Sequence, residues 1–154
     1  MSTSASVSPS QAFRVVGAIA IIAGGMLAAV TGPLQLEAGS WAAAYLVLVA
    51  GVAQYVMGIA VQHWHRTGPA QNWWWFALWN LGHIGVVGGT VAHSTILVFV
   101  ASGTLVVALV LAFLATFRTS DVAHRMLLIG YRILLVLLAI SIPVGMVISA
   151  IRNA

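Results

Sequence analysis

Two polar side chains, Asn80 and His83, interrupt the apolar stretch NWWWFALWNLGHIGVVGGTVAHS at residues 72–94. His83 follows Asn72 by eleven residues, which is about 15 Å along a helix and close to the middle of a bilayer. An imidazole at that depth can ligate a heme iron or donate a hydrogen bond to a quinone carbonyl. Ionisable groups inside a membrane are costly and usually functional, so His83 is the first candidate site residue.

Residues on two other apolar segments have a depth similar to that of His83. Gln54 and Tyr55 occupy the middle of one, and Arg132 lies seven residues, or about 10 Å, beyond Arg125 in another. Two alternatives stay open: the polar groups form only interhelical hydrogen bonds, and Arg132 extends toward the headgroups. The sequence predicts a cofactor-binding cluster of His83, Asn80, Gln54, Tyr55 and Arg132.

Histidines also gather near one predicted membrane surface. His63 ends one apolar segment and His124 precedes another, so two imidazoles could face each other as the axial ligands of a six-coordinate heme. The heme-iron candidates are therefore His83, His63 and His124. The alternative for His63 and His124 is that both are solvated at the interface.

The composition defines the class of protein that must position these residues. Of 154 residues, 62% are hydrophobic and 5% are charged, whereas a soluble domain has about 25% charged residues. The six Arg are scattered rather than clustered, which argues against nucleic-acid binding. Cysteine is absent, which excludes thiolate ligands and disulfides. These values predict an integral membrane protein whose solvent is lipid.

The apolar segments predict an all-α bundle of five transmembrane helices. Each segment is near the roughly 20 residues that a helix needs to cross a bilayer. A polar, disordered tail at residues 1–12 precedes a single domain at 13–154. The expected spans are 14–32, 41–63, 73–92, 95–117 and 126–150.

Charged residues predict how the five spans are oriented. Four Arg lie on the N-terminal side of the bilayer and one lies on the other side. The positive-inside rule then places the N-terminus in the cytoplasm and the C-terminus outside. We expect a bacterial-type plasma membrane.

Glycine, tryptophan and a second histidine indicate how the third span packs against its neighbours and where it meets the membrane surfaces. Gly82, Gly85 and Gly89 form a face that permits close packing against one neighbouring helix. The run Trp73–Trp75 is typical of an interfacial aromatic belt. His93 falls in the predicted turn after this span and is expected to be a surface residue.

Three functions compete on these observations. The first is binding of a hydrophobic redox ligand, heme b or a quinone, around His83. The second is a non-catalytic accessory or assembly subunit of a larger membrane complex, packed against other subunits or a second copy. The third is a small transporter or channel, against which stands the absence of Asp and Glu inside the spans. Hydrolytic chemistry is not expected, because the sequence shows no Ser–His–acid set, and the sequence leaves open whether the chain is an enzyme.

Overall fold

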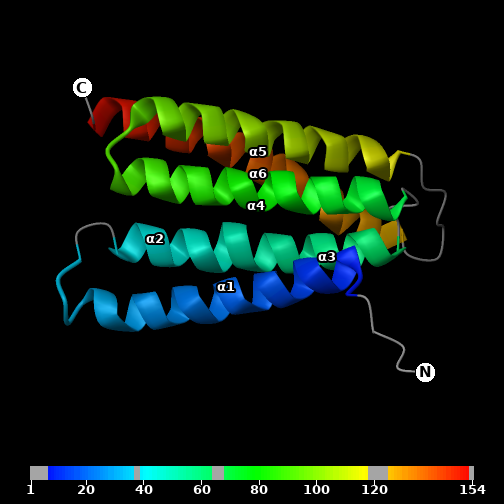
Figure 1. The fold of residues 1–154 in the computed structure, drawn as a ribbon, viewed down its shortest axis with the longest axis horizontal. Coiled ribbons are helices and arrows are strands. Elements are labelled where there is room, and N and C mark those ends of the chain that lie inside the picture. Colours follow the sequence, from blue (N-terminus) through cyan, green and yellow to red (C-terminus); the bar gives the residue numbers. More distant parts are fainter. Residues whose placement is uncertain (1–6, 37–38, 64–67, 118–124, 153–154) are drawn as a thin grey trace. The chain divides into compact units, whose positions relative to one another are not determined.

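The helices are those of a computed structural model that describes residues 7–36, 39–63, 68–117 and 125–152 (Figure 1). Every element in these ranges is a helix, which confirms the all-α prediction. They are α1 (Pro9–Thr31), α2 (Gly39–Tyr45), the π-helix η1 (Leu46–Ala53), α3 (Gln54–His63), α4 (Pro69–Val91), α5 (Thr95–Thr116) and α6 (Arg125–Arg152). The helices cluster into two compact units, residues 1–76 and 77–154, and α4 contributes to both.

Four helices in the described ranges are long and apolar enough to cross a membrane: α1, the continuous segment Gly39–His63, α5, and Arg125–Ile142 of α6. The 23-residue α4 is long enough but is not among them. Trp, Asn80, His83 and the glycines lower its mean hydropathy. These four helices are compatible with membrane insertion.

The first helix begins earlier than the sequence predicts. Residues 9–12 were expected in the polar tail, but α1 starts at Pro9. Ser8 is its N-cap: the Ser8 hydroxyl accepts from the Gln11 backbone N–H at 3.3 Å, and the Gln11 side chain accepts from the Ser8 N–H at 3.1 Å. This capping box, together with a proline that needs no donor at the first position, explains the early start.

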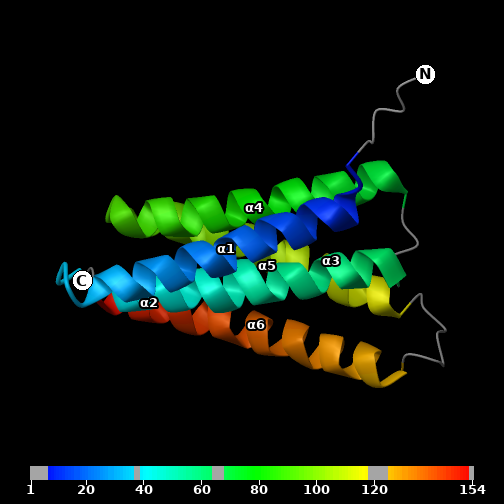
Figure 2. The same cartoon turned by 90° about the horizontal axis from the view of Figure 1, so that it is seen from below.

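In the first unit, α1 runs antiparallel to the continuous α2–η1–α3 segment (Figures 1 and 2). Glycines allow the two backbones to approach. A Cβ on Gly24 would lie 2.9 Å from the Val47 N atom, and a Cβ on Gly58 would lie 2.9 Å from the Ser10 carbonyl. Such close approach through small residues is the usual basis of helix association in membranes.

The π-helix keeps one row of residues facing α1. Ala43, Val47, Gly51 and Tyr55 all contact α1 and are spaced four apart. On an α-helix that spacing drifts by about 40° per step around the axis. A π-helix closes i→i+5 hydrogen bonds and has more residues per turn, so the same row stays on one side. We conclude that η1 maintains the register between α1 and its neighbour.

In the second unit, α5 contacts both α4 and α6 (Figure 1). Ser94 caps α5 through its side chain, which accepts from the Leu97 N–H at 3.4 Å. His93 adopts a positive φ of 51° in the turn before it and is exposed, as predicted.

The close contacts between α4 and α5 confirm the predicted glycine face. A Cβ on Gly82 would meet Leu105, one on Gly85 would meet Ala101, and one on Gly89 would meet Val98. The pairing of early residues of α4 with late residues of α5 makes the two helices antiparallel.

Candidate functional site

The strongest candidate site in the second unit is a buried pair of side chains on α4, Trp79 and His83. His83 is 6% exposed and Trp79 is 0% exposed. Their rings meet edge to face, with centroids 4.6 Å apart and planes at 83°. The helix explains the contact, because residues four apart lie one above the other on the same face.

Trp79 carries a polar atom that the fold leaves unsatisfied. Its Nε1 is buried and has no hydrogen-bond partner among the described residues. Leaving a buried donor unsatisfied costs about 1–3 kcal/mol. An indole N–H can only donate, so it would complement a carbonyl oxygen.

The sequence predictions did not include Trp79 in the site. Its spacing of four from His83 was the signal that could have found it. The run Trp73–Trp75 was interpreted as an interfacial aromatic belt at the start of α4. Two of the three tryptophans fit that prediction. Trp73 and Trp74 are exposed. Trp75 is buried, however, and packs on Phe13 of α1 with centroids 4.8 Å apart.

Asn80 lies on the same helix as His83 and is half-buried. Asn80 therefore lies at the border of the buried face of α4, whereas His83 lies within that face. Its buried members in the second unit are Trp79, Gly82, His83, Val86 and Gly89. His83, Gly82 and Gly89 thus share one broad buried face of the helix.

Gln54 and Tyr55 belong to the first unit and differ in exposure. Gln54 is the first residue of α3, directly after the π-helix, and is 1% exposed. Tyr55 is 41% exposed, and its backbone N, not its ring, lies against Gly17 of α1. Burial is therefore consistent with the predicted interior role of Gln54, whereas the Tyr55 side chain points outward.

Arg132 bonds to the end of α5. Its Nε donates to the Thr116 hydroxyl and its Nη2 donates to the Thr116 carbonyl, both at 3.0 Å. Its guanidinium carbon also lies 4.8 Å from the centre of the Phe117 ring. The hydroxyl of Thr116 in turn donates to the Phe113 carbonyl at 2.7 Å. Arg132 therefore satisfies a carbonyl at the C-terminus of α5, where the helix dipole favours a cation.

The packing of α4 on α5 shows how far Arg132 lies from the level of His83. Gly82, next to His83, is level with Leu105, and Thr116 is eleven residues beyond Leu105. Eleven residues correspond to about 16 Å along the helix. The structure thus brings Trp79, Asn80 and His83 together and holds Arg132 at a different depth.

The histidines predicted to face each other near the membrane surface are described only in part. His63 is exposed, and its Nδ1 donates to the Ile59 carbonyl at 3.0 Å. A carbonyl oxygen can only accept, so this bond places a proton on Nδ1. His124 lies outside the described residues. Within the described ranges, no three His, Asp or Glu side chains are grouped as metal ligands.

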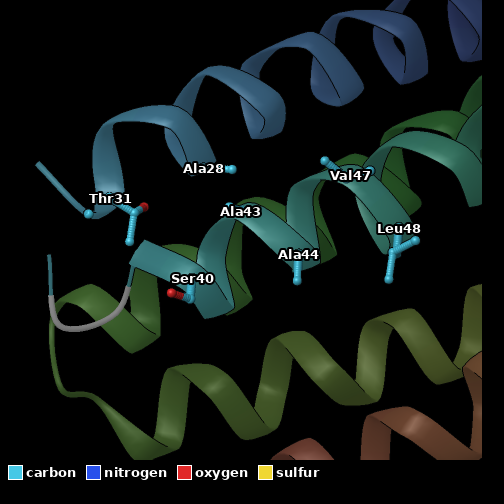
Figure 3. A pocket seen from close by; sticks show the side chains of 8 residues that line it. Ala28, Thr31, Ser40, Ala43, Ala44, Val47 and Leu48 are labelled. Atoms are coloured by element: carbon cyan, nitrogen blue, oxygen red, sulfur yellow. The ribbon is translucent and has the colours of Figure 1, made fainter.

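A separate groove of about 520 Å³ lies in the first unit, between the end of α1 and the start of the neighbouring helix (Figure 3). It contains none of the predicted site residues. Its lining consists of Ala28, Thr31, Gly32, Ser40, Ala43, Ala44, Val47 and Leu48. The Thr31 hydroxyl donates to the Leu27 carbonyl at 2.7 Å, so it serves its own helix.

The fold and the site define a class: a helical bundle with apolar helices that could span a membrane and with a buried histidine–tryptophan pair. Comparison with known proteins adds no family to that class. The chain matches no protein-family model, no curated protein and no solved structure.

Proposed function

We propose that this chain is an integral membrane protein that binds a hydrophobic redox ligand, heme b or a quinone, at the buried part of α4 around His83. The observation that carries the proposal is the contact between His83 and Trp79, whose buried indole N–H has no acceptor among the described residues. Two nitrogen-bearing rings in an apolar bundle suit an apolar ligand with a few polar atoms.

Of the two ligands, the donor chemistry favours the quinone. The Trp79 N–H can donate only, and a quinone carbonyl can accept only, so the two are complementary. A heme iron would instead require the lone pair of the His83 imidazole. Asn80, one turn away and half-buried, adds an amide that can serve either ligand. Gln54 is buried in the first unit, and its role in the ligand site stays a prediction from the sequence.

The proposed membrane arrangement has five spans, with α4 as the third. The N-terminus then lies in the cytoplasm and the C-terminus lies outside, in a bacterial-type plasma membrane. The buried His83 and the half-buried Asn80 contribute to the lower hydropathy of α4, and helices that carry functional polar groups have them inside the bundle.

Ligand spectra of the purified full chain test this proposal. Protein expressed with added heme should be measured oxidised and dithionite-reduced, and extracted quinone should be quantified in the same sample. We expect His83→Ala to abolish ligand retention and His93→Ala, in the exposed turn, to retain it. Equal ligand content in both variants and the wild type would show that the site on α4 is wrong.

An accessory or assembly subunit is the second candidate function. It is favoured by glycines that face open space on three helices of the second unit. A Cβ on Gly88, Gly103 or Gly130 would meet nothing within 4 Å. Outward-facing glycines permit close contact with helices of another subunit or of a second copy. Co-purification of a stable partner with a ligand-free chain would favour this function.

A further inference from the structure

The guanidinium of Arg132 is held in place by Thr116, but some of its N–H donors make no hydrogen bond to the described residues. A guanidinium has five N–H donors. The two bonds to Thr116 use one on Nε and one on Nη2, and no other hydrogen bond from Arg132 occurs within the described residues. The Nη1 group and the second Nη2 hydrogen therefore stay available on a side chain that is already ordered.

The charge of Arg132 is not balanced by a protein carboxylate in the described part of the chain. The two acidic residues of the whole sequence, Glu37 and Asp121, both lie outside that part. The partners of Arg132 are a hydroxyl, a carbonyl and the face of Phe117, and all three are neutral. Buried or half-buried charges are normally paired, and no carboxylate in the described part of the chain pairs with Arg132, so this position suits an anion from outside the chain.

The position of Arg132 indicates which anion can reach it. Thr116 is the last residue of α5, one of the helices able to cross a membrane, so the guanidinium lies where that span ends. Phe117 beside it is 61% exposed, and Ile129 and Ile133 on α6 are also exposed and apolar. A fixed cation bordered by exposed apolar side chains matches a phosphate attached to acyl chains.

We propose that Arg132, Thr116 and Phe117 form a binding site for the phosphate of an anionic phospholipid. Nη1 and Nη2 donate to two phosphate oxygens, the bidentate geometry that guanidinium groups favour. Phe117, Ile129 and Ile133 contact the acyl chains. In the proposed orientation this end of α5 is cytoplasmic, and the cytoplasmic leaflet carries anionic lipids. The site uses no residue of the ligand site around His83.

Lipid binding by the delipidated full chain tests the site. Native mass spectrometry from detergent gives the Kd of the first bound lipid for phosphatidylglycerol and for phosphatidylcholine. We expect the wild type to prefer phosphatidylglycerol by about tenfold, because the choline cation of phosphatidylcholine compensates its phosphate and weakens the pairing with a guanidinium. Arg132→Gln should remove that preference. Arg14→Gln is the matched control, because Arg14 is also half-buried and its Nε also donates to a carbonyl, that of Ser10 at 3.3 Å.

Three results would overturn the proposal. The first is an unchanged preference in Arg132→Gln. The second is equal loss in Arg14→Gln, which would indicate a general effect of charge. The third is displacement of the lipid by an equal concentration of inorganic phosphate, which would indicate a simple anion site.

A measurement on the wild type keeps the test decisive if Arg132→Gln does not fold. A photoreactive phosphatidylglycerol should label residues 113–117 and 125–136, and labelling confined to other residues would contradict the site. The ligand site is separable in the same experiments, because His83→Ala should leave lipid binding unchanged.

Discussion

Gly17 of α1 lies against the backbone of Gly51 in the π-helix. A Cβ on Gly17 would lie 2.9 Å from the Gly51 carbonyl oxygen and 2.7 Å from the Tyr55 N atom. Both neighbours are backbone atoms of a helix and cannot turn aside. The first unit therefore depends on the absence of a side chain at this position, and that dependence can be measured.

Gly17→Ala should destabilise the protein by about 1–3 kcal/mol, because overpacking forces the two helices apart. The matched control is Gly25→Ala on the same helix, where an added Cβ would meet nothing within 4 Å. That change should be neutral or stabilise by up to about 1 kcal/mol, through helix propensity. Unfolding in detergent micelles measures both, and equal effects would contradict the packing of α1 on η1.

Much of the fold was predictable because it follows from local chemistry. Gly32 and Pro33 end α1, Ser94 caps α5, and Gly82, Gly85 and Gly89 pack on one neighbour, all as the residue types require. Burial of His83 likewise follows from its place on an apolar helix.

Other features depend on contacts that the sequence does not contain. The π-helix arises from a fit between two helices, so the α-helical period alone missed it. The partner of Arg132 is Thr116, sixteen residues earlier, and no local pattern connects the two. Trp79 was overlooked because tryptophans were interpreted by their position in the membrane and not by their distance from His83.

The role of the π-helix can be tested by lengthening this segment. One alanine inserted after Val52, which is half-exposed, should add about 100° of helical rotation between Tyr55 and the pair Ala43 and Val47, and so turn that pair away from α1. We expect a loss of at least about 3 kcal/mol in the free energy of unfolding, since a row of buried contacts is lost. Val52→Ala keeps the chain length and should cost less than about 1 kcal/mol. An insertion variant as stable as the wild type would mean that η1 does not set the register.

Trp79→Phe removes the indole N–H but keeps an aromatic ring, so it distinguishes the contribution of the donor from that of packing. In ligand-free protein it should cost less than about 1.5 kcal/mol, because the lost packing is offset by removal of an unsatisfied donor. Ligand affinity should fall about tenfold, the value of one lost hydrogen bond in a buried site. Trp74→Phe, at a residue that is 74% exposed, should change neither quantity. Unchanged ligand affinity in Trp79→Phe would show that the indole N–H does not contribute to the proposed ligand site.

Thr116→Val tests the connection between α5 and α6. The substitution removes the hydroxyl that accepts from Arg132 and donates to Phe113. We expect a loss of about 1–3 kcal/mol, because a half-buried guanidinium loses a partner. Thr104→Val is the control: its hydroxyl donates within the helix to the Val100 carbonyl at 3.0 Å. A double-mutant cycle of Thr116→Val with Arg132→Gln should be non-additive, and simple additivity would show that the two side chains act independently.

The number of spans depends on whether α4 crosses the membrane, and single cysteines can decide it. The chain has no cysteine, so Val7→Cys and His93→Cys each introduce one thiol at an exposed position, before α1 and after α4. If α1, the Gly39–His63 helix and α4 all cross, these positions lie on opposite sides. An impermeant maleimide added to intact cells should then label His93→Cys and not Val7→Cys, and permeabilised cells should show both. Labelling of both or neither in intact cells would place the two on one side and leave α4 outside the set of spans. In that case His83 would not lie within the bilayer, and a polar environment at the membrane surface would explain its presence better than a ligand inside the bilayer.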